Sequence, residues 1–156
     1  MMSDVELDNI DLEIINLIKD DARLSVRDIS RAIKKAPSTV LNRLRKLKKL
    51  GVIKGYVTLI DYSKLNYQVN AITLLQVEGT HIEDVEKSLS AEPNVRAIYD
   101  VTGEYDIIIL TTFKNVGDLD RFIKRLLKMP YVKRSVTNIA FRIVKESPNL
   151  REPLTY

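Results

Sequence analysis

The chain has 156 residues and a formal net charge of +4, and with 45% apolar and 29% charged residues its composition is that of a folded globular protein. Because it has no cysteine and only one histidine, His81, disulfide bonds, thiolate chemistry, sulfur-ligated metals and imidazole clusters are excluded, and we expect no metal, cofactor or catalytic residue. The beginning, Met1 to Asp4, lacks the layout of a signal peptide, and no apolar run approaches the roughly 18 residues that cross a bilayer, so we expect a cytoplasmic protein that does not bind membranes.

The charges are unevenly distributed along the chain. Residues 1–30 hold three basic and eight acidic side chains, whereas residues 31–54 hold nine basic and no acidic ones. A charged helix face that only increases solubility usually has acidic residues interspersed with the basic ones. The window 31–54 lacks them, so it predicts a folded surface with a strong positive field and a polyanion as its ligand.

Two short helices are predicted before this window. Apolar residues at helical spacing predict a helix over residues 9–20, with Asp8 as its N-terminal cap. Ser25, followed three residues later by Asp28, resembles a capping box and predicts a second helix that ends at about residue 34.

A third helix follows a tight connection at residues 34–36. Pro37 suits its first turn, and Gly51 suits its C-terminal end. One face is apolar and the opposite face is polar and positive, which is the pattern of a helix-turn-helix recognition helix. The predicted DNA-binding residues are Ser38, Thr39, Asn42, Arg43, Arg45, Lys46, Lys49 and Lys54.

We assign these residues two roles. Asn42 and Arg43 lie in the first two turns, where a recognition helix meets base edges, and they suit bidentate pairing with adenine and guanine respectively. The remaining cations suit phosphate contacts, which position a protein on DNA without reading its sequence. A protein-binding three-helix fold could share the helix spacing, but it would not be expected to carry this charge.

A small hairpin is predicted to close this first domain. Residues 52–53 and 56–60 are rich in apolar and β-branched side chains and flank Lys54 and Gly55, a two-residue turn. We therefore expect a winged-helix-like, helix-turn-helix domain over residues 1–55, and a hinge strand or linker over residues 56–68.

The rest of the chain repeats the order strand, helix, strand. The predicted strands are 71–78, 95–101, 105–112 and 135–144, and the predicted helices are 82–89 and 116–127. This order predicts an α+β chain whose second domain, residues 69–146, is a ferredoxin-like βαββαβ sandwich with both helices on one face. Residues 107–110 are all apolar, so this strand presents apolar side chains to both faces of the sheet. We therefore expect a second subunit to cover the open face. The alternative is a monomer with a half-hydrated sheet. Residues 147–156 are expected to be an extended tail, either packed on a neighbour or loose.

The turn at residues 102–106 is the most pocket-like stretch. Gly103 allows a turn whose backbone amides can hold a carboxylate, and Asp106 can accept an ammonium group, so the two together suit an amino acid. A plain hairpin turn would explain the glycine equally well.

Four motifs then carry a family resemblance. Leu7-Asp8-x-x-Asp11 opens the first helix, Asp21-Ala22-Arg23 follows it, and the stretches 51–56 and 101–106 read Gly-Val-Ile-Lys-Gly-Tyr and Val-Thr-Gly-Glu-Tyr-Asp. With these motifs in register over residues 7–148, the chain resembles the Lrp/AsnC, or feast/famine, family of transcriptional regulators.

The resemblance implies a helix-turn-helix domain joined by a hinge to a ligand-binding domain of the RAM or ACT-like type, in homodimers that assemble into octamers. It also implies an amino-acid effector near the turn, and the matching positions here are Gly103, Tyr105, Asp106, Asp118, Ser135 and Thr137. One residue departs from the family pattern: Ala36 stands where a serine commonly precedes the recognition-helix proline, so Ser38 or Thr39 would have to cap this helix.

The predicted function is a sequence-specific transcriptional regulator that binds double-stranded DNA and is modulated by an amino acid or a related small molecule. One alternative is an enzyme similar to the siroheme decarboxylases, which resemble this family; it would need basic or imidazole groups at a C-terminal pocket, whereas His81 falls in a turn before a helix. The other alternative is an architectural DNA binder of low specificity, which would use the same basic residues.

Overall fold

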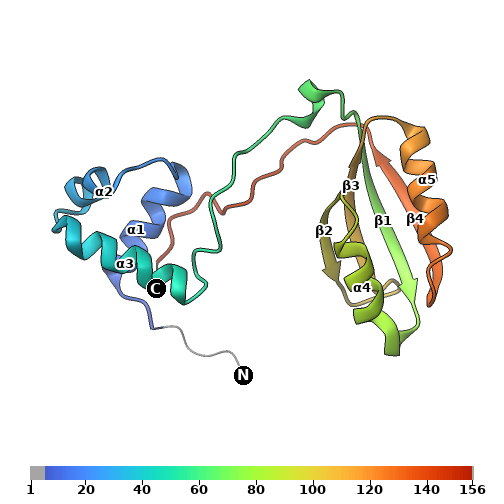
Figure 1. Cartoon of the computed structure of the whole chain (residues 1–156), viewed down its shortest axis with the longest axis horizontal. Coiled ribbons are helices and arrows are strands. Elements are labelled where there is room, and N and C mark those ends of the chain that lie inside the picture. The colour runs from blue at the N-terminus through green and yellow to red at the C-terminus, as the bar shows by residue number, and fades with distance from the viewer. Residues whose placement is uncertain (1–5, 156) are drawn as a thin grey trace. The chain divides into compact units, whose positions relative to one another are not determined.

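The computed structural model describes residues 6–155; residues 1–5 and Tyr156, at the ends of the expected first domain and of the expected tail, lie outside the described residues. The chain forms two compact units (Figure 1): an N-terminal unit, whose range extends to Leu59 and resumes at Glu146, and a C-terminal unit over Ile60–Lys145. The tail therefore belongs to the N-terminal unit of its own chain.

Three helices make up the N-terminal unit: α1 (Asn9–Asp20), α2 (Val26–Ile33) and α3 (Pro37–Lys49). Both predicted caps are present. The Asp8 carboxylate accepts from the backbone N–H of Asp11 at 3.0 Å, and the Ser25 hydroxyl accepts from the backbone N–H of Asp28 at 3.2 Å. In both cases the acidic side chain accepts in return from the N–H of the cap residue, which completes a capping box and satisfies donors that the helix leaves unpaired.

The start of α3 is an exception. Ala36 stands at its cap without a side-chain hydrogen bond, and among the described residues neither Ser38 nor Thr39 replaces it, so the predicted substitute cap is wrong. Apolar packing compensates: Val40 and Leu47 of α3 are fully buried, and they pack in one cluster with Ile14 and Ile29 of the other two helices.

The predicted hairpin after α3 does not form. Gly51 ends the helix in the left-handed region, with φ of 72°, and the N–H of Ile53 then donates to the carbonyl of Leu47 at 3.2 Å. Because this amide is used to close the helix end, it is not available for a strand ladder, and residues 52–60 contain no strand.

The C-terminal unit has the predicted ferredoxin-like arrangement. Its strands are β1 (Val69–Val77), β2 (Val95–Asp100), β3 (Ile107–Phe113) and β4 (Val132–Ala140), and they pair antiparallel in the order β2-β3-β1-β4. Its α-helices are α4 (Ile82–Ser90) and α5 (Val116–Leu126), and short 3-10 helices lie at η1 (Tyr62–Leu65) and η2 (Gly79–His81). None of the described helices is long and apolar enough to span a bilayer.

The last strand is shorter at its C-terminal end than the sequence predicts. We expected it to reach residue 144, but β4 ends at Ala140, which faces Asn70 of β1. Because β1 begins at Val69, β1 has only one more residue that a longer β4 could pair with. Residues 141–144 are therefore exposed although their side chains favour a strand.

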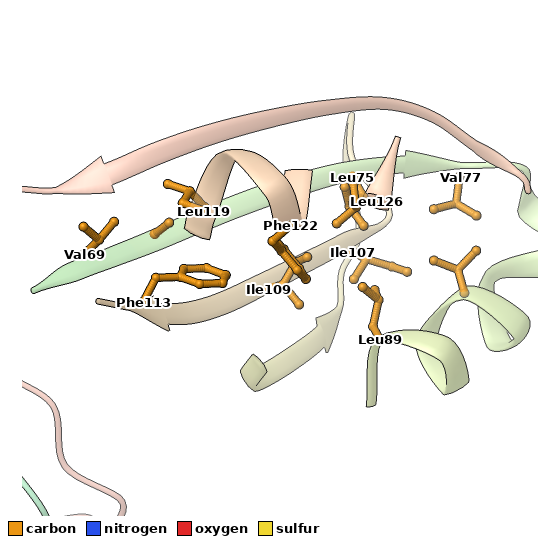
Figure 2. Close-up of a cluster of buried hydrophobic side chains, with 12 residues drawn as sticks. Val69, Leu75, Val77, Leu89, Ile107, Ile109, Phe113, Leu119, Phe122 and Leu126 are labelled. Carbon is orange, nitrogen blue, oxygen red and sulfur yellow. The ribbon is translucent and has the colours of Figure 1, made fainter. Parts of the chain in front are cut away.

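The two faces of the sheet differ. Alternate residues of β1 and β3 are buried beneath α4 and α5, and Figure 2 shows this core, in which the Phe113 and Phe122 rings lie 5.4 Å apart. The residues between them point to the helix-free face, where the Ile72 and Tyr99 side chains are 40% and 52% exposed. In the described chain this face has an apolar surface that no helix covers.

Candidate nucleic-acid interface and ligand site

The exposed face of α3 is a stripe of four polar side chains: Ser38, Asn42, Arg45 and Lys49. At 100° per residue these positions lie within about 60° of one another. All four are exposed, and within the part of the chain that the structure describes neither cation of the stripe has an ion-pair partner. We call these four residues the α3 stripe.

Arg43 and Lys46 occupy a different face of α3, turned toward the start of α1. Arg43 Nη1 lies 2.6 Å from the Asp8 carboxylate and 3.3 Å from that of Asp11. Lys46 Nζ lies 2.7 Å from the Asp11 carboxylate and also donates to the carbonyl of Glu6 at 3.1 Å. Arg43 and Lys46, predicted as a guanine ligand and a phosphate ligand, are thus both engaged in ion pairs inside the unit.

These four charged groups form an internal network with no net charge. The Asp11 side chain is fully buried, whereas those of Arg43 and Lys46 are 28% and 37% exposed. The backbone N–H of Asp11 and, to a lesser degree, the Arg43 guanidinium hold the pKa of Asp8 below its usual 3.8, and the hydrogen bond to Asp8 raises the pKa of Arg43. The network fixes α3 against α1, so we interpret Arg43 and Lys46 as positioning residues.

The other predicted DNA ligands have varied surroundings. Thr39 is half-buried beside the stripe, and Lys54 is exposed in the segment after α3. Lys48, in the last turn of α3, lies 4.9 Å above the Tyr56 ring, so its ammonium group is in a cation–π contact. Among the described residues, the cations of this unit without an ion-pair partner therefore include Arg45, Lys48 and Lys49 of α3 and Lys54 after it.

In the C-terminal unit, the turn between β2 and β3 borders a cavity of about 650 Å³. Its lining residues are Leu74, Asp100, Val101, Thr102, Glu104, Tyr105 and Ile108. Gly103 makes the turn possible, because its φ of 128° lies in a region that other residues rarely adopt. Leu74 and Ile108 come from the helix-free face of the sheet, so the cavity has an apolar floor beside a polar turn.

A cation and two acidic residues lie around this turn. Asp100 and Glu104 are both among the lining residues, but Asp100 is directly opposite the buried Ile107, so its side chain projects to the helix-covered face. Arg134 of β4 lies 3.5 Å from the Glu104 carboxylate. The Arg134 guanidinium is also 5.8 Å from the centre of the Tyr105 ring. Both signs of charge are thus available to a zwitterionic ligand.

The six predicted effector residues do not all lie at the cavity. Gly103 and Tyr105 belong to the turn that borders the cavity, but Asp106 does not line it, because its carboxylate accepts from the N–H of Val77 at 2.7 Å and holds the turn against β1. Asp118 accepts from Asn115 and Arg121 at the start of α5. Both carboxylates are thus engaged in hydrogen bonds within the unit.

Ser135 and Thr137 lie on the other face of the sheet. Thr137 is directly opposite Thr73, whose side chain is fully buried, and the two hydroxyl oxygens are 3.0 Å apart. Residues directly opposite in an antiparallel pair project to the same face, so Thr137 points to the helix-covered side. The sequence does not predict Leu74 and Ile108 as cavity residues. Alternate residues of a strand point to opposite faces of the sheet, and only the strand register shows which of them face away from the helices.

The single histidine is engaged outside the cavity. The His81 ring stacks on that of Tyr131 with centroids 3.5 Å apart, and its Nδ1 lies 3.1 Å from the Asp84 carboxylate. It is not among the residues that line the cavity at the turn, so the decarboxylase alternative finds no imidazole there.

Comparisons with known proteins match both units. The model of the Lrp/AsnC ligand binding domain matches residues 70–150, and the model of a winged helix-turn-helix DNA-binding domain matches residues 7–54. The chain belongs to the Lrp/AsnC family. It is a helix-turn-helix transcriptional regulator with an N-terminal DNA-binding domain and a C-terminal ligand-binding domain.

Relatives within the Lrp/AsnC family support this assignment over nearly the whole chain. An HTH-type transcriptional regulator of Pyrococcus furiosus is 38% identical over 142 residues, which cover 91% of this chain and 96% of the relative. The structure of LrpC from B. subtilis is 31% identical, with a TM-score of 0.78, over 90% of this chain and 98% of that one. A transcriptional regulator of Neisseria meningitidis in complex with L-Met shares the fold at 23% identity, with a TM-score of 0.84, over 93% of this chain and 96% of that one.

Proposed function

We propose that this Lrp/AsnC regulator reads a dyad-symmetric site on double-stranded DNA with the α3 stripe of each subunit of a homodimer. The proposal rests on the observation that two faces of α3 have different surroundings. Arg43 and Lys46 are held by Asp8 and Asp11, whereas the stripe residues are exposed and available for bases and phosphates. Arg45 takes the role of the guanine ligand, since it lies on the stripe with Asn42.

A homodimer is supported by the helix-free face of the sheet. Ile72 and Tyr99 are exposed there, and Leu74, Ile108 and Leu110 are half-buried on the same face. Such a surface favours burial against a second copy of the sheet. Two recognition helices in a dimer should then meet major grooves about 34 Å apart, or one helical turn.

The dimer is tested by light scattering on Ile72→Asp. A charge on this face should shift the mass from a dimer, or from the octamer that the family resemblance implies, to a monomer. Val116→Asp is the matched control, because Val116 is 58% exposed at the start of α5, on the helix side. A dimer that survives Ile72→Asp unchanged would show that the subunits associate elsewhere.

The effector is an amino acid with an apolar side chain, bound in the cavity at the turn. Leu74, Val101 and Ile108 suit an apolar side chain, while the Glu104 carboxylate and the Arg134 guanidinium suit the ammonium and carboxylate groups. The cavity volume is within the roughly 300–1,000 Å³ of small-molecule sites. L-Met, which the Neisseria meningitidis relative binds, is the first compound to test.

The DNA proposal is tested by selecting bound duplexes from a random pool, with and without L-Met. We expect enrichment of a dyad-symmetric motif with half-sites about one helical turn apart. Failure to enrich any such motif, together with tight binding to all duplexes, would support the architectural alternative instead.

The effector proposal is tested by calorimetric titration with L-Met. Glu104→Gln removes the charge that faces the ammonium group, so we expect binding to weaken roughly tenfold. The control is Asp120→Asn, which removes an exposed carboxylate of α5 that pairs with Lys124. Equal affinity in both variants would move the effector site away from this cavity.

A further inference from the structure

The end of the chain is bound to α1 by a side chain that imitates a peptide group. Asn16 Nδ2 donates to the carbonyl of Leu154 at 3.0 Å, and the N–H of Leu154 donates back to Asn16 Oδ1 at 2.8 Å. Both backbone groups of one tail residue are therefore satisfied by one amide. The primary amide of an asparagine side chain has a donor and an acceptor in one plane, which matches the two groups of a peptide backbone.

A second set of contacts lies one turn further along α1. Lys19 Nζ donates to the carbonyls of Leu150 and Arg151 at 3.3 and 3.4 Å, and the Lys19 side chain is only 9% exposed. Asn149 Nδ2 in turn donates to the carbonyl of Lys19 at 3.1 Å. That carbonyl belongs to the last turn of α1, where helical partners are missing, so the tail caps the helix.

These contacts connect α1, along the chain, to β4, whose Arg134 pairs with the cavity residue Glu104. The strand ends at Ala140. Only residues 141–148 separate this strand from Asn149, the first tail residue bound to α1. The ligand-binding domain is thus joined to α1 both by the covalent linker after α3 and by the docked tail.

We propose that residues 149–154 are a brace of the DNA-binding unit, and that docking of this brace on Asn16 and Lys19 couples β4 to α1. The brace stabilises α1, against which the charged network holds α3. The coupling half of the proposal rests on the proposed function, because it needs an effector that changes DNA affinity. The docking half does not.

The docking half is tested by amide hydrogen exchange on the full chain without DNA. Asn16→Leu keeps the size of the side chain but removes both hydrogen bonds, so the Leu154 amide should exchange about tenfold faster or more, and the α1 amides should also exchange faster. Glu152→Ala, in the exposed part of the tail, is the matched control and should leave both rates unchanged. A Leu154 amide that exchanges equally fast in wild type and Asn16→Leu would overturn the docking.

A chain that ends at Ser147 gives a second test with the sequence of α1 intact. It lacks all the docked residues, so the N-terminal unit should unfold at a lower temperature than in wild type. An unchanged unfolding temperature would contradict the brace even if Asn16→Leu had failed to fold.

The coupling half is tested with a duplex selected from the pool. L-Met should change the affinity of wild type for this duplex by a measurable factor, and that factor should fall toward one in Asn16→Leu and in the shortened chain, with L-Met binding unchanged. A factor equal to that of wild type in both variants would overturn the coupling. Wild type that binds no duplex would instead defeat the proposed function, while the exchange experiment would still decide the docking.

Discussion

Replacing Asp11 by asparagine tests the claim that Arg43 and Lys46 position α3. The substitution preserves the shape of a fully buried side chain but removes its charge. Two cations that now share this carboxylate, at 3.3 and 2.7 Å, would then face a neutral amide. The change also weakens the capping box, in which the Asp11 carboxylate accepts from the N–H of Asp8 at 3.2 Å.

The expected loss of stability follows from the burial of the partners. Breaking a fully buried ion pair by removing one partner costs about 3–5 kcal/mol, whereas an exposed pair contributes at most about 1 kcal/mol. Here Asp11 is fully buried but Arg43 and Lys46 are 28% and 37% exposed, so water can solvate the freed cations in part. We therefore expect Asp11→Asn to cost about 2–3 kcal/mol, between the two limits.

The assay is thermal and denaturant unfolding of the full chain, with hydrogen exchange of the α1 and α3 amides to report on the N-terminal unit. For a unit of this size the loss corresponds to a fall in Tm of about 10–20 °C. Glu13→Gln is the control, because it removes the same charge from an exposed position of α1. If Asp11→Asn unfolded at the temperature of Glu13→Gln, the network would contribute nothing and the positioning role would be refuted.

Three further predictions concern the turn, the pH dependence and the DNA contacts. Gly103→Ala should destabilise the C-terminal unit by about 1–3 kcal/mol in denaturant unfolding through backbone strain alone, whereas Gly79→Ala should have a small effect, since an added Cβ meets nothing within 4 Å at either site. Asp8 has a pKa lowered from 3.8, chiefly by the N–H of Asp11, so its contribution to stability is complete above about pH 4 and is lost as the pH falls through the folded-state value. The free energy of unfolding of the N-terminal unit should therefore drop as the pH falls below about 4, and less so in Asp8→Asn. Lys49→Ala should weaken binding to all DNA sequences alike and reduce the slope of affinity against salt by about one, as measured by mobility shift at several salt concentrations.

The elements that the sequence predicts best are those with local signals. Asp8 and Ser25 cap their helices as expected, because a cap depends only on residues three positions away. The ferredoxin-like order could be predicted because each strand and helix carries its own hydrophobic period.

The elements that the sequence misplaces depend on distant partners. Residues 141–144 have strand-forming side chains, but β1 starts at Val69 and offers almost nothing to pair with. The hairpin after α3 fails because the amide of Ile53 closes the helix end instead.

The candidate sites show the same division. The exposed face of α3 follows from helical periodicity, so the positions of Asn42, Arg45 and Lys49 could be predicted. The engagement of Arg43 could not, because its partner Asp11 is 32 residues away and becomes a neighbour only when α1 packs on α3. The family resemblance places Thr137 with the turn residues, whereas its pairing with Thr73 of β1 turns it to the helix-covered face, and this register depends on a strand more than 60 residues away.

The most direct test of the account is the affinity of Arg45→Ala and Arg43→Ala for the selected duplex and for duplexes changed at each base pair. We predict that Arg45→Ala loses about 1–3 kcal/mol and its preference at one base pair of each half-site, with the unfolding temperature unchanged. Arg43→Ala should instead lower the unfolding temperature and keep the base preference of wild type. If Arg45→Ala kept full preference while Arg43→Ala lost it, the assignment of the α3 stripe to DNA recognition would be contradicted.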